Sequence, residues 1–106
     1  MNPLLYASCL LTVAAFTATA GAADTVHIGI VKLAFAPAQV SAHVGDTIEW
    51  TNNDFIVHTA TARDKGWDVA IPSKGTGRVT LKNVGDIEYY CRFHPNMVGH
   101  ISVSAR

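Results

Sequence analysis

Four side chains in this sequence have the chemistry of a copper site. Cys91, His94 and Met97 follow one another at intervals of three residues, and His58 lies far upstream. One thiolate and two imidazoles can form a trigonal site, which a thioether approaches weakly along its axis. Sulfur ligands favour Cu(I) and imidazole also accepts Cu(II), so this set permits one-electron cycling. Electron transfer is the chemistry that follows from these donors.

The three clustered donors are expected on a short connection after a strand that ends at Cys91. Pro95 fixes its own φ angle and biases His94 away from helical conformation, so we expect no regular secondary structure between Cys91 and Gly99. His58 must come from another part of the sheet. A metal ion held in this way joins distant segments, and its affinity is therefore coupled to folding.

The first 23 residues have the composition of an export signal. Residues 4–20 are apolar and small, and they lead into Ala20-Gly21-Ala22-Ala23, which contains a cleavage site of the A-x-A type. We expect residues 1–23 to be a signal peptide and residues 24–106 to be one copper-binding domain exported to the periplasm. Met1-Asn2-Pro3 lacks the usual Lys or Arg, so an uncleaved membrane anchor is the alternative.

The cysteine count favours ligation of Cys91 over a disulfide. Cys9 falls in the predicted signal, so the exported domain of about 83 residues has Cys91 alone. A single thiol in an oxidising compartment is a liability unless it is protected, paired between chains or ligated. The charge is balanced, with eight basic and eight acidic residues, and this argues against nucleic acid as a partner. We expect a monomer, with no membrane contact unless the signal is retained.

Alternating hydrophobicity predicts an all-β domain. Residues 26–30, 47–50 and 78–81 each alternate between apolar and polar side chains, as half-buried strands do. Turns are predicted at residues 45–46, 75–77 and 85–86. No segment keeps helical periodicity for three turns. A small β-sandwich or barrel is the expected architecture.

The same alternation predicts where the thiol points. Ile87, Tyr89 and Cys91 share one face of their strand, so Cys91 should face the interior at the strand's end. Ile101 and Val103 alternate with polar residues after Gly99, which predicts a final strand beside the Cys91 strand. The metal-binding connection would then lie at one end of the domain.

These motifs resemble the cupredoxin family of type 1 blue copper proteins, and in particular its amicyanin-like branch. The spacing Cys-x-x-His-x-x-Met at residues 91–97 is the amicyanin pattern, and residues 45–52 look like the strand that precedes the family's first ligand, His58 here. The resemblance implies a Greek-key β-sandwich with one type 1 copper ion. It implies His58, Cys91 and His94 as strong ligands and Met97 as the weak axial ligand.

The resemblance also implies a function and partners. Cupredoxins shuttle single electrons between periplasmic redox proteins, and in amicyanins a dehydrogenase is the donor and a c-type cytochrome the acceptor. We therefore expect an electron carrier and no enzymatic activity. Two departures from the family pattern bear on the reduction potential: Arg92 follows Cys91 where many relatives have a small hydroxyl residue, and Thr59 follows His58 where Asn is common.

His94 is the expected route for electrons, and Phe93, Pro95, Met97 and Val98 are expected to form an apolar rim around it. Such a rim suits the small contacts of redox encounters. Asn52 and Asn53 are candidates for hydrogen bonds that bridge the two ligand segments, with a simple turn role as the alternative.

Each of these residues taken alone also has a purely structural interpretation. Cys91 could be an ordinary buried thiol and Met97 a core residue, and His27, His43 and His100 are expected to be solvated. A copper chaperone without a redox relay is the alternative function. A hydrolase that uses Cys91 with His58 or His94 is the enzymatic alternative, although no oxyanion-hole motif accompanies them.

Overall fold

A computed structural model describes residues 3, 7–14 and 21–106 of the chain. Residues 7–14 form neither helix nor strand, and the side chains of Leu10, Leu11 and Val13 in this segment are exposed. Residues 1–2, 4–6 and 15–20 of the predicted signal peptide lie outside the described residues. Among the residues described, no helix has the length and apolar character needed to cross a membrane.

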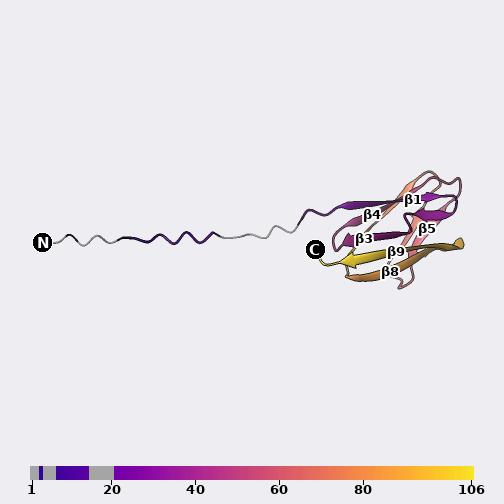
Figure 1. The fold of residues 1–106 in the computed structure, drawn as a ribbon. Coiled ribbons are helices and arrows are strands. Elements are labelled where there is room, and N and C mark those ends of the chain that lie inside the picture. Colours follow the sequence, from indigo (N-terminus) through magenta and orange to yellow (C-terminus); the bar gives the residue numbers. More distant parts are fainter. Residues whose placement is uncertain (1–2, 4–6, 15–20) are drawn as a thin grey trace.

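The domain is built from β-strands alone within the described residues. The strands are β1 (Thr25–Val31), β2 (Ala34–Ala36), β3 (Gln39–His43), β4 (Thr47–Asn52), β5 (His58–Ala62), β6 (Asp68–Ile71), β7 (Thr76–Thr80), β8 (Gly85–Cys91) and β9 (His94–Ser104). They form a four-stranded sheet in the order β2-β1-β4-β7 and a five-stranded sheet in the order β3-β9-β8-β5-β6. The two sheets lie face to face as layers (Figure 1), which confirms the expected β-sandwich.

The pairing is mixed, because β1 runs parallel to β4 and β3 runs parallel to β9, whereas the other pairs are antiparallel. The predicted strands at residues 26–30, 47–50 and 78–81 correspond to β1, β4 and β7. β9 lies beside β8 as predicted, and the C-terminus lies at the opposite end of the domain from the β8–β9 connection (Figure 1).

The turn predicted at residues 45–46 is confirmed, whereas the turns predicted at residues 75–77 and 85–86 are wrong in part or in whole. Gly77 lies in β7, and Gly85 and Asp86 begin β8. A Cβ at position 77 would lie 2.6 Å from Cγ1 of Val69, so glycine serves packing there instead of a turn. The metal-binding connection is also shorter than expected, because β9 begins at His94 and leaves only Arg92 and Phe93 between the strands.

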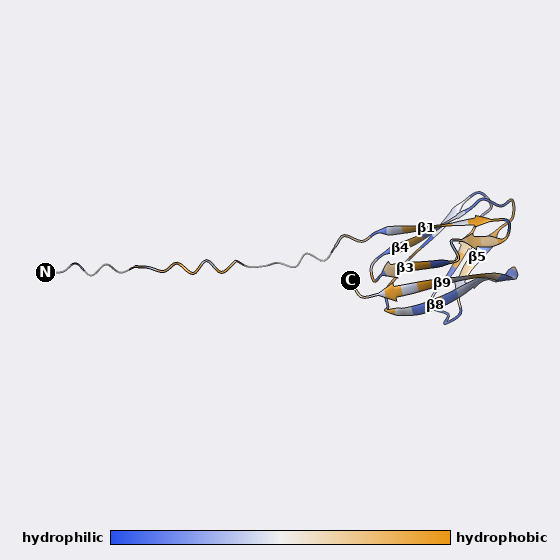
Figure 2. Ribbon diagram, viewed as in Figure 1, coloured by the Kyte–Doolittle hydropathy of each residue, from blue (hydrophilic) through white to orange (hydrophobic). Residues whose placement is uncertain are grey.

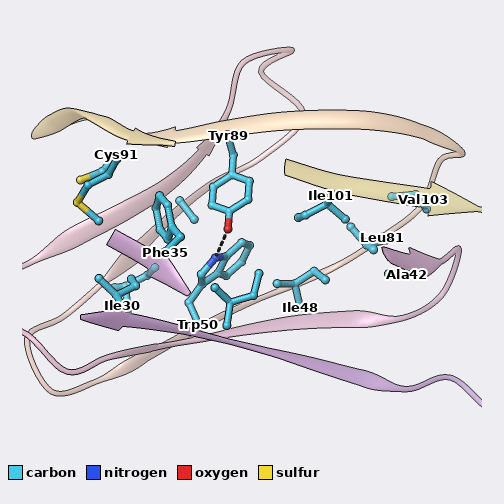
Figure 3. Packing of buried hydrophobic residues seen from close by; sticks show 14 residues of the cluster. Ile30, Phe35, Ala42, Ile48, Trp50, Leu81, Tyr89, Cys91, Ile101 and Val103 are labelled. Atoms are coloured by element: carbon cyan, nitrogen blue, oxygen red, sulfur yellow. Dashed lines mark hydrogen bonds between the residues drawn. The ribbon is translucent and has the colours of Figure 1, made fainter. Parts of the chain in front are cut away.

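Aromatic side chains fill the core between the two sheets. Trp50 donates a hydrogen bond from Nε1 to the Tyr89 hydroxyl at 3.3 Å, and both side chains are fully buried (Figure 3). Phe35 packs edge-on against Tyr89 at a centroid distance of 4.7 Å, and Trp67 lies 5.4 Å from Trp50. Alternating hydropathy along the strands matches this arrangement (Figure 2). The core therefore crosses from one sheet to the other through Trp50 and Tyr89.

Tyr89 also explains a glycine in the neighbouring strand. Tyr89 and Gly99 are direct cross-strand partners, and the Tyr89 ring occupies the space that a side chain at position 99 would need. Burial raises the pKa of the Tyr89 hydroxyl to about 12, and the hydrogen bond from Trp50 offsets part of that rise.

We expect the domain to lose stability at alkaline pH through Tyr89. The folded pKa of about 12 exceeds the ordinary value of 10.0, so the unfolded chain releases its proton first and stability falls as the pH rises from about 10 to about 12. Urea unfolding of the metal-free domain at pH 8.5 and pH 11 measures the effect. Tyr89→Phe should weaken this alkaline fall and cost about 1 kcal/mol at pH 8.5 through the lost hydrogen bond. A Tyr90→Phe variant, at a half-buried position, is the control; an equal alkaline fall in Tyr89→Phe and wild type contradicts the prediction.

Candidate metal centre

Cys91 lies at the end of β8 and faces the interior, as the alternation in the sequence predicted. Cys91 and Tyr89 are both fully buried, and Cys91 lies at one end of the core, far from Val103 and Leu81 at the other (Figure 3). A register shift between Tyr90 and Cys91 interrupts the pairing of β8 with β9 at this point. Such an irregularity re-aims side chains next to a site, and here it accompanies the short β8–β9 connection.

The structure brings together three of the four predicted donors. Cys91 Sγ lies 3.7 Å from Nδ1 of His58 and 3.8 Å from Nδ1 of His94. The three ligand atoms all lie within 4.8 Å of one another. His58 begins β5 and is fully buried, whereas His94 begins β9 and is half-buried. The imidazole rings cross at 67° with their centroids 5.2 Å apart.

These separations suit ligands that share one ion. For bonds of about 2.3 Å to a thiolate and about 2.0 Å to an imidazole, the values known for zinc, a trigonal angle places sulfur and nitrogen about 3.7 Å apart. The two S···N distances in the structure are 3.7 and 3.8 Å. One soft sulfur with two imidazole nitrogens is a set that copper accepts in both of its common oxidation states. The residues present therefore fit a copper ion.

Met97 lies in β9 and is buried, with 3% of its surface exposed, in the same core cluster as Cys91. The expectation that Met97 contributes to an exposed rim around His94 is therefore wrong. Burial next to the core agrees with an approach to the site from the inside, and the axial role of Met97 stays a prediction.

Thr59 connects the two ligand segments. Its backbone N–H donates to Cys91 Sγ at 3.4 Å, and its Oγ1 accepts a hydrogen bond from the Arg92 amide at 2.9 Å. The bridge that the sequence suggested for Asn52 or Asn53 is therefore made by Thr59. Asn52 instead donates to the carbonyls of Ile56 and Ile71, so it shapes the loop that precedes His58.

The Thr59 contacts continue into a ring of hydrogen bonds. Thr59 Oγ1 lies 2.9 Å from Thr61 Oγ1, and Thr61 donates to Asp68 at 2.7 Å. The Arg92 side chain closes the ring on the same Asp68 oxygen at 3.2 Å. The Thr61 hydroxyl lowers the pKa of the Asp68 carboxyl, and Arg92 acts in the same direction. Arg92 and Thr59, the two departures from the family pattern, thus belong to one network.

Asp54 lies against the other side of His58. Its Oδ2 is 2.9 Å from Nε2 of His58, the ring nitrogen that points away from Cys91. The same carboxylate accepts hydrogen bonds from the amides of Lys32 at 2.8 Å and Leu33 at 3.0 Å. The Leu33 amide holds the pKa of the Asp54 carboxyl below its usual range, and His58 and the Lys32 amide add to this effect. Only the position of Asp54 four residues before His58 hinted at this contact in the sequence.

Exposed apolar side chains surround this end of the sandwich. Phe93, beside His94, is 52% exposed, and Pro95 is also exposed, as predicted. The loop between β4 and β5 adds three residues that the sequence analysis did not identify, Phe55, Ile56 and Val57, of which Phe55 is 87% exposed. The signal was present, because three consecutive apolar residues in a loop are unusual on a surface.

The remaining histidines are solvated, as predicted. His27, His43 and His100 have side chains between 49% and 69% exposed, and each lies near a carboxylate. They lie outside the group formed by His58, Cys91 and His94.

Residues 4–103 match the family described as the cupredoxin-like domain. The amicyanin of Paracoccus versutus is 25% identical in an alignment of 87 residues that covers 76% of this chain and 66% of that protein, just under two thirds of its length. The crystal structure of that amicyanin has a TM-score of 0.69 at 26% identity and covers 79% of this chain and 85% of its own. A purple cupredoxin from Nitrosopumilus maritimus has a TM-score of 0.68 at 25% identity, with 74% and 98% covered.

We expect Thr59→Val to loosen the two ligand segments, because valine matches threonine in shape but cannot bond the Arg92 amide or Thr61. Loss of these two hydrogen bonds should lower the free energy of unfolding of the metal-free domain by about 1–2 kcal/mol. Urea unfolding measures it. Thr76→Val, on the exposed part of β7, is the matched control and should stay within about 0.5 kcal/mol of wild type. Equal stability of the two variants contradicts a structural role for the Thr59 hydroxyl.

Proposed function

Because the chain belongs to the cupredoxin-like domain family, we propose that it carries single electrons by means of a copper ion held by His58, Cys91 and His94, with Met97 as the weak axial ligand. The convergence of one thiol and two imidazoles within 4.8 Å is the observation that carries this proposal. The family and this group of residues together indicate one type 1 copper ion as the cofactor.

Bound copper supplies reversible one-electron chemistry between Cu(I) and Cu(II). The chain keeps the ligand atoms in place while the charge changes. Cys91 and His58 are fully buried, and the Thr59 N–H points at the sulfur. A donor aimed at a thiolate stabilises its charge without reorganisation, because the hydrogen bond is already made. A site held on strands β5, β8 and β9 is stiff enough for transfer with little rearrangement.

Electrons enter and leave through the half-buried His94. The surrounding docking face consists of the exposed side chains Leu33, Phe55, Ile56, Val57 and Phe93. Apolar contact surfaces suit weak redox encounters that bury less than about 1,200 Å². Cations flank this face: Lys74 Nζ lies 4.1 Å from the centroid of the Phe55 ring, and Arg92 lies over Phe93. A partner with an apolar patch and acidic groups around it matches this arrangement.

The location and partners follow from the same proposal. Residues 1–23 act as the signal peptide, residues 24–106 form the domain, and the domain shuttles electrons in the periplasm between a donor, such as a dehydrogenase, and an acceptor, such as a c-type cytochrome. A copper chaperone needs accessible, exchangeable ligands, whereas Cys91 and His58 are fully buried. The same burial argues against Cys91 as the nucleophile of an enzyme.

The visible and EPR spectra of residues 24–106 with one equivalent of Cu(II) test the ligand set. We expect an intense visible thiolate-to-copper band that ascorbate bleaches and an oxidant restores. Cys91→Ser should abolish this band, whereas Met97→Leu should keep it and change the reduction potential. His100→Ala, at an exposed histidine, is the control and should leave the band unchanged. A colourless wild-type protein, or an unchanged band in Cys91→Ser, contradicts the proposal.

Lys74→Glu tests the docking face through small redox reagents. We expect the reduced protein to react severalfold more slowly with the anion ferricyanide at low salt, and faster with a cationic cobalt complex, because the charge beside Phe55 is reversed. The difference should fade as the ionic strength rises toward about 1 M, where the Debye length is about 3 Å. Lys82→Glu, in the β7–β8 connection at the other end of the domain, is the matched control. Equal rate changes in both variants contradict an electron route at this face.

A further inference from the structure

Asp54 joins the buried ligand His58 to a turn of the other sheet. One carboxylate oxygen accepts from Lys32 N–H at 2.8 Å, and the other lies 3.0 Å from Leu33 N and 2.9 Å from His58 Nε2. Lys32 and Leu33 form the connection between β1 and β2. The carboxylate therefore lies between an imidazole in one sheet and two backbone amides in the other.

We propose that Asp54 is a positioning residue that fixes the tautomer and orientation of His58 and sets how strongly this imidazole donates to the metal. The effect on copper rests on the proposed function, whereas the effect on the tautomer concerns the protein alone. An ionised carboxylate can only accept hydrogen bonds, so its neighbour Nε2 must carry the ring proton. Nδ1 then keeps its lone pair, and this is the atom that lies 3.7 Å from Cys91 Sγ. The opposite tautomer would place a proton between the two ligand atoms.

The turn holds the carboxylate in an unusual way. Lys32 and Leu33 both have positive φ angles, 50° and 60°, although neither is glycine. Positive φ is uncommon for such residues, and here it points two successive N–H groups at one anion, as anion-binding backbone concavities do. The two-residue hairpin between β1 and β2, in which Val31 pairs with Ala34, requires positive φ at both central residues, and the Asp54 carboxylate accepts from both N–H groups that this turn presents.

The backbone of Asp54 is fixed as well. Its N–H donates to Asn52 Oδ1 at 2.9 Å, and its carbonyl accepts from the Ser73 hydroxyl at 2.9 Å. The carboxylate of Asp54 is thus anchored on both sides and cannot follow a ring that rotates. A hydrogen-bonded carboxylate behind a ligating histidine fixes the ring and raises its basicity, and loss of such a partner typically costs 10–100-fold in metal affinity.

The first experiment needs no metal. In wild-type apo-protein, ¹⁵N chemical shifts of His58 should report a proton on Nε2 and none on Nδ1. Asp54→Ala should give a mixture of the two tautomers, because the acceptor is lost. Asp64→Asn is the control: this exposed aspartate accepts the Gly66 N–H at 2.7 Å in the β5–β6 turn and is remote from His58. An unchanged His58 tautomer in Asp54→Ala overturns the proposal, even if the variant is less stable.

The second experiment uses Asp54→Asn, which keeps a side-chain oxygen but removes the charge. We expect Cu(II) affinity to fall about tenfold more than Cu(I) affinity, because a less basic imidazole weakens the more highly charged ion most. For one electron this ratio equals a rise of about 59 mV in reduction potential. Equal ratios in Asp54→Asn and Asp64→Asn overturn the effect on copper. If no variant binds copper, the proposed function fails while the tautomer measurement still decides the role of Asp54.

Discussion

The candidate site depends on how two strands remain connected after their regular pairing has ended. β5 and β8 form a backbone ladder only at the pairs Thr61↔Tyr90 and Ala62↔Tyr89. Beyond that point Thr59 joins the two strands. Its N–H donates a hydrogen bond to the Cys91 sulfur, and its hydroxyl accepts one from the Arg92 amide. The strands can therefore separate enough to leave room for ligand atoms without losing contact. His58 directly precedes Thr59, so the hydrogen bonds that join Thr59 to Cys91 and Arg92 also fix the position of His58.

The aromatic core explains why this end of the sandwich can be stiff. Tyr89 lies two residues before Cys91 on the same face of β8, and it packs against Trp50 and Phe35 from the opposite sheet. Any rotation of β8 that moved Cys91 would also move Tyr89 out of this packing and away from Trp50 Nε1. Close-packed interiors resist such shifts, because a change in side-chain volume of about one methylene already alters the packing. The thiol position is therefore tied to the centre of the core.

Much of this arrangement was predictable from the sequence. Period-two alternation identified β1, β4 and β8, since each has one buried and one polar face, and it placed Cys91 in the interior. β5 was not predicted because it alternates only between threonine and alanine, whose small side chains give a weak hydrophobic pattern, although four of its five residues are buried. The role of Thr59 was also missed. The sequence does not show from which amide a threonine hydroxyl will accept a hydrogen bond. The partner depends on the separation of β5 and β8 in the folded domain.

The two histidines are restrained to different degrees, and this asymmetry suits an electron carrier. His58 is fully buried and has the Asp54 carboxylate on one ring nitrogen and Cys91 on the other. His94 is half-buried among exposed apolar residues, and no carboxylate of the described residues lies against it as Asp54 lies against His58. One imidazole can thus keep the geometry of the site constant, while the other faces the partner. If both rings were buried, electrons would have no short path to the surface. If both were exposed, water would reach the thiolate and the site would lose the low polarity that makes its hydrogen bonds effective.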